Sequence, residues 1–336
     1  MAASPVTPTI PLDAPGKHHG HLRLPYSRDD SAWGSVMIPI TVIHGGDGPT
    51  ALFTAGNHGD EYEGPIALHD LAMTLEPKAI AGRVIVLPSM NHPAFLAGRR
   101  TSPIDAGNLN RSFPGRPDGT VTQKIAHFVA SRLVPEADIV LDFHSGGRTL
   151  DFLPFAASHR LDDKAQEAAC AAAAAAFGAP WTMQMTDLDN VGMFDTEVER
   201  QGKTFVTTEL RGGGTATAES VAIARHGARN LLHHAGILPG APEPATSRRL
   251  AMPHDGFLFA TAAGLYEPLV DLGQPVRAGA PLARIWSPDR TGLMPLEIRA
   301  QRSGVLAARH FPGLIQTGDC LAVIATAIDE GAPGSD

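Results

Sequence analysis

The sequence is poor in cysteine, and its two cysteines, Cys170 and Cys320, lie far apart without a Cys-x-x-Cys spacing. A disulfide framework and a cysteine-ligated zinc site are therefore not indicated. Apolar runs are short, and none approaches the roughly 20 residues that a membrane-spanning helix needs. The segment 1–20 lacks a basic region followed by an apolar one, so we expect a loose arm and not a targeting peptide. A cytoplasmic protein that does not associate with membranes is the expectation.

An excess of positive charge is also missing, since the formal net charge is -8 at pH 7. This balance disfavours non-specific binding of nucleic acid. The hydrophobic fraction of 43% and the charged fraction of 18% are typical of a globular protein. A chain of 336 residues exceeds what one hydrophobic core usually supports, so we expect about two domains.

The stretch 50–64 reads T-A-L-F-T-A-G-N-H-G-D-E-Y-E-G and combines a strand with two candidate metal ligands. Its apolar run 51–55 predicts a buried strand, and His58 and Glu61 follow in a polar turn. A histidine and a glutamate three positions apart can face one point above the carboxyl edge of a sheet, where open α/β sheets bind ligands. Taken alone the pair is weak evidence, because most His-x-x-Glu pairs are solvated turn residues.

Strands alternate with helices as far as residue 236, which indicates an α/β domain with a parallel or mixed sheet flanked by helices. Besides the strand at 51–55, we expect strands at 83–88, 138–144 and 204–209. A strand or hairpin within 21–43 should come before all of them. The expected helices are 62–75, 120–133, 161–177 and 217–235.

The sequence pattern changes near residue 245, which predicts a second domain. A linker rich in proline, alanine and glycine covers 239–244, and beyond residue 252 short β runs recur without a helical period. We therefore divide the chain into a loose arm at 1–20, an α/β catalytic domain at 21–244, a β-rich domain at 245–328 and a tail at 329–336. The second domain should be a small all-β, barrel-like module.

Three expected strands end in residues that could share one site: His58 with Glu61, then His144, then Glu209. Strands that point the same way end at the same edge of a sheet, so these side chains can converge. Two histidines and a glutamate suit a catalytic zinc, because they leave a coordination position open for water. Zinc in such a set activates water and polarises a substrate carbonyl.

Two carboxylates near these strand ends suggest supporting roles. Asp142 lies two residues before His144, on the same strand face, and could orient an imidazole. Glu209 is the natural general base, which would take a proton from water and deliver it to a leaving amine. The alternative for Glu209 is a glutamate that caps a turn.

The long connection 91–117 has no regular period, and loops of that length in compact domains are usually functional. It contains Arg111, whose planar guanidinium suits a carboxylate, beside the amide of Asn110. Upstream in the same loop, Arg99 and Arg100 are candidates for stabilising the oxyanion of a tetrahedral intermediate.

The motifs His58-Gly-Asp-Glu61, Asn108-Leu-Asn-Arg111 and Asp142-Phe-His-Ser145, with Glu209 before a glycine-rich turn, resemble the succinylglutamate desuccinylase/aspartoacylase family in residues and in order. The resemblance covers nearly the whole chain. It implies the zinc carboxypeptidase fold with an appended β domain, and removal of acyl groups from N-acyl amino acids.

Carried over by position, the resemblance implies one Zn²⁺ per chain on His58, Glu61 and His144, with Glu209 as the catalytic carboxylate. It implies that Asn110 and Arg111 bind the substrate α-carboxylate. Arg100 is then favoured over Arg99 as the oxyanion partner. Asn108 departs from the aspartate that relatives often have. The family also has a substrate-binding tyrosine, for which Tyr266 is a weak candidate here.

Several stretches, among them 56–64 and 145–154, are most similar to family members that deacetylate Nα-acetyl-L-2,4-diaminobutyrate in ectoine degradation. This substrate is therefore expected, and its free ammonium would need a carboxylate. The candidates are Asp151, Asp187, Asp189 and Asp195. Alternatives are a deacylase of acidic N-acyl amino acids such as N-acetylaspartate or N-succinylglutamate, a zinc carboxypeptidase, and a non-enzymatic binding protein.

The β-rich domain resembles biotinyl- or lipoyl-type barrels, but a carrier domain needs a lysine at a hairpin tip. No lysine follows Lys203, so the carrier function is excluded. We expect this domain to limit access to the site or to form a contact in a possible homo-oligomer.

Overall fold

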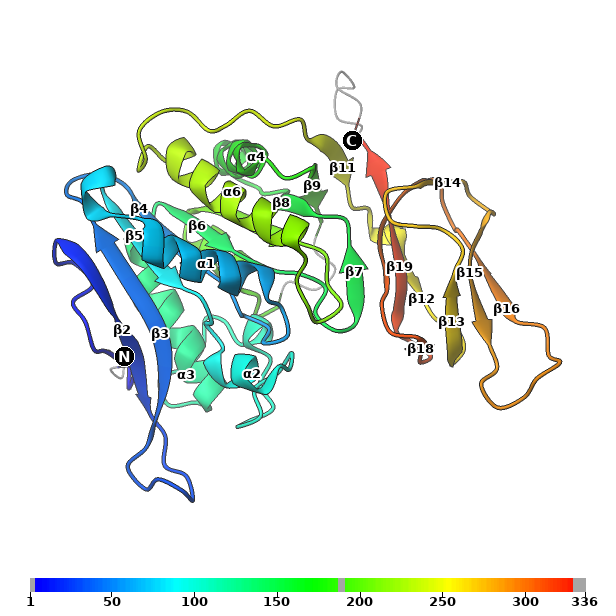
Figure 1. Ribbon diagram of the computed structural model, residues 1–336, viewed down its shortest axis with the longest axis horizontal. Helices are drawn as coiled ribbons and strands as arrows, with labels where there is room; N and C mark the ends of the chain where they lie inside the picture. Colours follow the sequence, from blue (N-terminus) through cyan, green and yellow to red (C-terminus); the bar gives the residue numbers. More distant parts are fainter. Residues whose placement is uncertain (1–3, 187–190, 329–336) are drawn as a thin grey trace.

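A computed structural model describes residues 4–186 and 191–328, and most strands of this part join one long mixed sheet of 15 strands (Figure 1). Its order is β1 (Thr7–Pro8), β2 (Gly16–Pro25), β3 (Ser35–His44), β5 (Arg83–Leu87), β4 (Thr50–Thr54), β6 (Ile139–Asp142), β10 (Thr204–Glu209), β8 (Phe155–His159), β9 (Trp181–Met185), β11 (Arg248–Ala251), β19 (Cys320–Ala327), β17 (Gly304–His310) and β14 (Pro275–Val276). In addition, β12 (Phe257–Phe259) pairs with β19, and β7 (Leu150–Phe152) pairs with β17.

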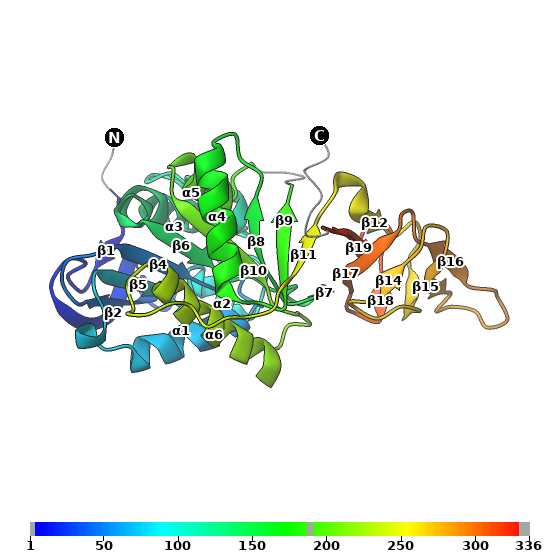
Figure 2. The ribbon, with the colours of Figure 1, turned by 90° about the horizontal axis from the view of Figure 1, so that it is seen from above.

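Helices cover both faces of the α/β part of this sheet (Figure 2). On one face lie α1 (Glu63–Thr74) and α6 (Ala218–His234), and on the other lie α3 (Val121–Phe128) and α5 (Phe194–Arg200). Helix α4 (Lys164–Phe177) packs on α6 and β8. The expected α/β sheet flanked by helices is confirmed.

The central strands explain why the sequence shows continuous apolar runs there. Strands β4, β5 and β6 are buried along their whole length because helices cover both of their faces. Neighbouring residues of β4 face opposite cores: Phe53 packs in the core beneath α1 and α6, and Leu52 packs in the core beneath α3. Burial of each such side chain contributes about 1.5–3 kcal/mol.

Strands β4, β5, β6 and β10 run parallel to one another. Their carboxyl ends therefore lie along one edge of the sheet, which is where the sequence places its candidate site residues. Strand β8 runs antiparallel to β10 and brings its first residue, Phe155, level with Glu209.

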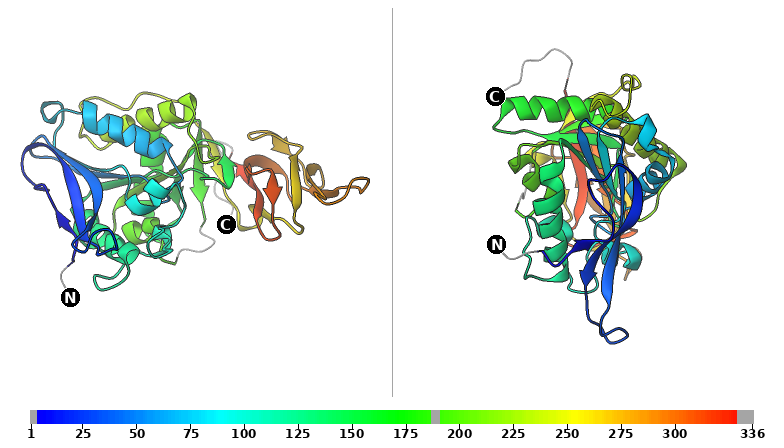
Figure 3. Two further views of the ribbon diagram at one scale, coloured as in Figure 1. Left: turned by 60° about the horizontal axis from the view of Figure 1, so that its bottom comes forward. Right: turned by 90° about the vertical axis from the view of Figure 1, so that its left-hand side faces the viewer.

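The β-rich domain lies at one end of the molecule (Figures 1 and 3). A second sheet of four strands, β16 (Leu296–Arg299), β15 (Pro281–Trp286), β13 (Gly264–Pro268) and β18 (Leu314–Ile315), encloses a separate apolar core with β12, β17 and β19. Strand β11 pairs with β9 on one side and β19 on the other, and β7 pairs with β17. Backbone hydrogen bonds of the long sheet thus join the two parts of the chain.

The structure differs from the sequence-based expectation in several places. The expected loose arm at 1–20 is partly in the sheet, because its residues 7–8 form β1, its residues 16–20 begin β2, and these two strands pair. The side chain of Val6 is also buried. The long connection 91–117 contains the short helix α2 (His92–Ala97). Strands β8 and β9 and helix α5 were not predicted. The tail 329–336 lies outside the described residues.

The remaining short helices connect these elements. They are η1 (Pro77–Ala79), η2 (Leu109–Arg111), the π-helical turn η3 (Val129–Leu133), η4 (Val134–Glu136) and η5 (His254–Gly256). The π-helical turn continues α3, so the expected helix 120–133 is present but changes its hydrogen-bonding pattern after residue 128. No helix in the described ranges is long and apolar enough to cross a membrane.

Candidate active site

His58 and Glu61 lie in the turn between β4 and α1, and close packing against α2 holds that turn. The backbone N–H of Gly59 donates to the carbonyl of Arg99 at 3.0 Å. A Cβ on Gly59 would lie 2.0 Å from the carbonyl carbon of Ala94, so only glycine allows this approach. The turn therefore presents both side chains at the carboxyl edge of the sheet.

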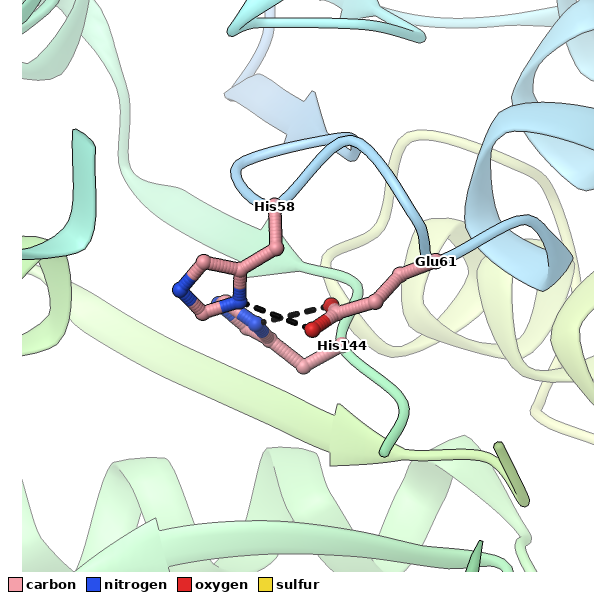
Figure 4. Close-up of side chains that lie close together, drawn as sticks. All are labelled: His58, Glu61 and His144. Atoms are coloured by element: carbon pink, nitrogen blue, oxygen red, sulfur yellow. Dashed lines mark hydrogen bonds and ion pairs between the residues drawn. The ribbon is translucent and has the colours of Figure 1, made fainter. Parts of the chain in front are cut away.

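His144 follows β6, the neighbour of β4, and completes a buried group of three candidate metal ligands. The ligand atoms of His58, Glu61 and His144 lie within 4.8 Å of one another, and the three side chains point toward one another (Figure 4). The Glu61 carboxylate bridges the two rings, with Oε1 2.8 Å from Nδ1 of His58 and Oε2 3.1 Å from Nδ1 of His144. In the described part of the chain, no other group of histidines, cysteines and acids meets this spacing.

Asp142 lies behind His144 and sets the orientation of its ring. Nε2 of His144 donates to Oδ2 of Asp142 at 2.8 Å, which leaves Nδ1 as the ring nitrogen that faces Glu61. The Asp142 carboxylate also accepts hydrogen bonds from Thr54 Oγ1 at 2.6 Å and from Asn57 Nδ2 at 3.0 Å. These contacts fix both the carboxylate and the imidazole.

The protonation states of two of the three side chains suit metal binding. Burial lowers the pKa of His58, so its imidazole is neutral at neutral pH. Burial by itself would raise the pKa of Glu61, but the adjacent His58 and His144 rings outweigh burial and hold it well below the ordinary value. Burial likewise opposes the charged form of His144, but the carboxylates of Asp142 and Glu61 raise its pKa. A metal would therefore displace a proton from His144.

Glu209 is the last residue of β10 and lies in the same buried region. Burial raises its pKa to about 8, and the charge of Glu61 acts in the same direction. Among the described residues, Oε2 of Glu209 has no hydrogen-bond partner. A carboxyl group with a raised pKa and an unpaired oxygen in a cavity is suited to proton transfer.

A single cavity of about 190 Å³ contains most of the candidate residues. The side chains predicted from the sequence that line it are His58, Glu61, Arg100, Asn110, Arg111, His144 and Glu209. Asp142 does not line the cavity and contacts it through His144. The structure thus brings together residues from three strand ends and from the long connection.

Comparison with known proteins identifies the family of this chain. The family described as succinylglutamate desuccinylase/aspartoacylase catalytic domain matches residues 47–235. The N-alpha-acetyl-L-2,4-diaminobutyric acid deacetylase of Halomonas elongata is 53% identical over 329 residues, which cover 97% of this chain and 96% of that protein. The chain belongs to the succinylglutamate desuccinylase/aspartoacylase family.

Solved structures of relatives extend the likeness to the whole chain. A product-bound structure of the ectoine utilization protein EutE from Ruegeria pomeroyi superimposes with a TM-score of 0.96 at 58% identity, covering 97% of this chain and 100% of that one. A succinylglutamate desuccinylase from a Silicibacter species has a TM-score of 0.95 at 60% identity, covering 98% of this chain and 100% of that one. Both domains, not the α/β part alone, therefore follow the aspartoacylase fold.

The two arginines of the connection differ in their relation to the cavity. Arg100 lines it, with Nη1 3.4 Å from Nδ1 of His58 and 3.9 Å from Oε1 of Glu61. Arg99 is not among the lining residues, and its carbonyl accepts the hydrogen bond from Gly59. The side chain of Arg100 is 48% exposed, so it lies at the edge of the cavity.

Asn110 and Arg111 reach the cavity from the short helix η2. Asn108 begins this helix and accepts a hydrogen bond from the backbone of Asn110 at 3.0 Å. Oδ1 of Asn110 accepts from the backbone N–H of Phe194 at 2.9 Å, which ties the connection to α5. Nη1 of Arg111 donates to the carbonyl of Asn110 at 2.7 Å. Asn108 therefore supports the pair and does not line the cavity.

The apolar walls of the cavity were not predicted from the sequence; they are formed by Leu150, Phe152, Met185 and Met193. Such residues carry no chemical signal, because they look like any buried strand or loop residue. Leu150 and Phe152 belong to β7, which pairs with β17 of the β-rich domain. That domain thus supports one wall of the cavity.

Tyr266 lies elsewhere and does not line the cavity. Its ring packs against His310 with a centroid distance of 5.5 Å, inside the β-rich domain. Burial raises its pKa to about 12. Tyr266 is therefore a packed residue of the β-rich domain, and its position does not support the role in substrate binding that the resemblance suggested for it.

Proposed function

We propose that the protein is a zinc-dependent deacetylase that hydrolyses Nα-acetyl-L-2,4-diaminobutyrate to L-2,4-diaminobutyrate and acetate in ectoine degradation. The observation that carries the proposal is the buried His58–Glu61–His144 group in one cavity with Glu209. The 53% identity to a protein named for this deacetylation supports the choice of substrate.

The three proposed ligands fit zinc by their chemistry. Two imidazole Nδ1 atoms and one carboxylate are donors that zinc prefers, and three protein ligands are the usual number at a catalytic site. We assign one Zn²⁺ per chain to His58, Glu61 and His144. When bound, zinc supplies Lewis acidity that polarises the acetyl carbonyl and lowers the pKa of water. Asp142 holds His144 in the orientation that directs Nδ1 to this position.

Glu209 moves the proton in the proposed reaction. Its carboxylate takes a proton from water as the water oxygen bonds to the acetyl carbon. It then gives the proton to the substrate nitrogen as the C–N bond breaks, so the products are acetate and a free amino acid. The buried, unpaired Oε2 of Glu209, in the cavity with the three proposed metal ligands, supports this role.

Three further residues bind and stabilise the substrate in this proposal. The guanidinium of Arg100, beside the His58–Glu61 pair, stabilises the negative charge that develops on the carbonyl oxygen. Arg111 and Asn110 bind the α-carboxylate, and the hydrogen bond from Phe194 fixes the amide of Asn110 for this task.

The size of the cavity favours a single small substrate over a peptide. Its volume of about 190 Å³ lies below the roughly 300–1,000 Å³ of pockets that hold drug-sized ligands. A peptide would need a cleft that continues past the reacting amide. The small cavity therefore supports an N-acyl amino acid deacylase and not a carboxypeptidase.

The test is release of free amine from Nα-acetyl-L-2,4-diaminobutyrate, N-acetylaspartate and N-succinylglutamate, each with and without a chelator. We expect chelator-sensitive turnover of the first substrate alone. Turnover of an acidic substrate instead would overturn the assigned substrate and keep the metal chemistry. Turnover of none of the three by zinc-loaded protein would overturn the proposed function.

A further inference from the structure

The cavity contains an acidic side chain that the proposed chemistry does not use. Among the described residues that line it, the carboxylates are Glu61, Glu209 and Asp195. The first belongs to the proposed metal site and the second to proton transfer. Asp195 lies in the first turn of α5, is only 7% exposed and contributes to neither task.

The Asp195 carboxylate is held in place by its neighbours. Its Oδ1 accepts hydrogen bonds from the backbone N–H of Thr196 at 2.6 Å and from Oγ1 of Thr196 at 3.2 Å. Its Oδ2 lies 3.8 Å from Nε2 of His159, an ion-pair distance too long for a direct hydrogen bond. Nδ1 of His159 donates to Oε1 of Glu199 at 2.9 Å. His159 thus lies between two buried carboxylates and is fixed by one of them.

Asp195 lies on helix α5, which is hydrogen-bonded to Asn110, one of the two residues proposed to bind the α-carboxylate. Phe194 directly precedes Asp195, and its backbone N–H donates to Asn110 at 2.9 Å. Asp195 and Asn110 therefore lie on elements that are joined by a hydrogen bond, and both line the cavity. A substrate whose α-carboxylate contacts Asn110 and Arg111 would place a short side chain in the same part of the cavity.

The other acidic candidates from the sequence are less suited. Asp151 is paired with Arg211 at 3.1 Å and lies 3.7 Å from Arg309, so arginines already neutralise it. It is also absent from the cavity lining. Asp187 and Asp189 lie outside the described residues. Asp195 alone among the four is known to line the cavity.

We propose that Asp195 is the specificity residue that binds the side-chain ammonium of the substrate, and that His159 and Glu199 position it. This inference rests on the proposed function and names the residue that selects a diamino acid. A carboxylate attracts an ammonium and repels a second carboxylate, so Asp195 also disfavours N-acetylaspartate and N-succinylglutamate. Selection of this kind depends on charge and not on the size of the side chain.

The experiment measures binding, so it does not depend on turnover. The affinities of zinc-loaded protein for L-2,4-diaminobutyrate and L-2-aminobutyrate, which lacks the ammonium, are determined by calorimetry for the wild type, Asp195→Asn and Glu197→Gln. Glu197 is the matched control, since it is a buried acid on the same helix that does not line this cavity. Asp195→Ser is a second variant should Asp195→Asn not fold.

We expect the wild type to prefer L-2,4-diaminobutyrate, and Asp195→Asn to lower that preference by about 30-fold, because a charge-assisted hydrogen bond is lost. Glu197→Gln should keep the wild-type preference. The inference is overturned if the wild type has no preference, if it binds neither amino acid, if Asp195→Asn keeps the preference, or if Glu197→Gln loses it equally. Selective binding without deacetylation would overturn the proposed function and leave the ammonium site standing.

Discussion

Nε2 of His144 lies 2.8 Å from Oδ2 of Asp142, and this contact turns Nδ1 of the same ring toward Glu61. The carboxylate of Asp142 accepts three hydrogen bonds, from the hydroxyl of Thr54, the amide N–H of Asn57 and the ring N–H of His144. The buried carboxylate of Asp142 thereby connects strand β4, the turn after β4 and strand β6 by hydrogen bonds at the proposed metal site.

Replacing Asp142 by Asn should weaken metal binding by about 10- to 100-fold. An amide oxygen carries no negative charge and accepts a weaker hydrogen bond than a carboxylate, so the contact that holds the His144 ring in its orientation weakens. Zinc affinity measured by competition with a chromophoric chelator checks this. Asp151→Asn is the control, because Asp151 is buried but pairs with arginines instead. Equal zinc affinity in Asp142→Asn and the wild type would refute the orienting role.

Replacing Glu209 by Gln should lower kcat by about 100- to 10,000-fold while the protein keeps its zinc. The amide has nearly the same shape as the carboxylate but cannot accept a proton from water. Turnover is measured together with metal content by mass spectrometry. A variant that loses its zinc, or one that turns over at the wild-type rate, would contradict the role of Glu209 as the base.

Replacing Arg100 by Ala should lower kcat by about 100- to 1,000-fold, and replacing Arg99 by Ala should have little effect. Only Arg100 lines the cavity, where it lies near His58 and Glu61. The two neighbours have the same charge and flexibility, so each serves as the control for the other. Steady-state kinetics on both variants checks the assignment, and a larger loss in Arg99→Ala would reverse it.

Much of this arrangement could be predicted because its signals are local. Strands β4, β6 and β10, which precede or contain His58, His144 and Glu209, are buried over most of their length and have apolar residues at their centres. Each is followed by, or ends in, a polar residue that a hydrophobic core would not accommodate. The order of the motifs then identified the family. The strand ends and the family could both be inferred without knowing any contact between distant parts of the chain.

The remaining features depend on contacts between distant segments. The segment 16–20 lacks a strong apolar pattern and is a strand because β3 offers it a partner. Met185 and Met193 become cavity walls only once β9 and α5 are placed beside the long connection. Arg100 could be favoured over Arg99 only by resemblance, because two adjacent exposed arginines look alike until the connection is folded.

Asp105 should stabilise the protein, because its hydrogen bonds hold the connection 91–117, which contains Arg100 and Asn110, against helix α3. Its carboxylate accepts hydrogen bonds from the backbone N–H and Oγ1 of Thr122, at 2.7 and 2.8 Å, and from the N–H of Gly107 at 3.1 Å. Burial by itself raises the pKa of Asp105, but these hydrogen bonds outweigh it and lower the pKa. The stabilisation is therefore present at neutral pH and is lost as the pH falls.

Replacing Asp105 by Ala should lower the free energy of unfolding by about 1–3 kcal/mol at pH 7. The difference from the wild type should stay constant above about pH 4, where the unfolded aspartate takes up a proton, and should shrink as the pH falls further through the lower pKa of the folded state. Urea denaturation at pH 7, 4 and 3 checks both points. Asp118→Ala is the control, since Asp118 is exposed and pairs only with Arg116 among the described residues. A loss that stays constant with pH would exclude the carboxylate as its source.

The most direct measurement is a titration of metal-free protein with Zn²⁺ while acetate release from Nα-acetyl-L-2,4-diaminobutyrate is followed. We expect no activity without metal, a linear rise to one Zn²⁺ per chain and no further gain beyond it. The same titration of His144→Ala should give no rise at stoichiometric zinc. Full activity in metal-free protein, or a maximum reached only at two equivalents, would contradict a single zinc on His58, Glu61 and His144.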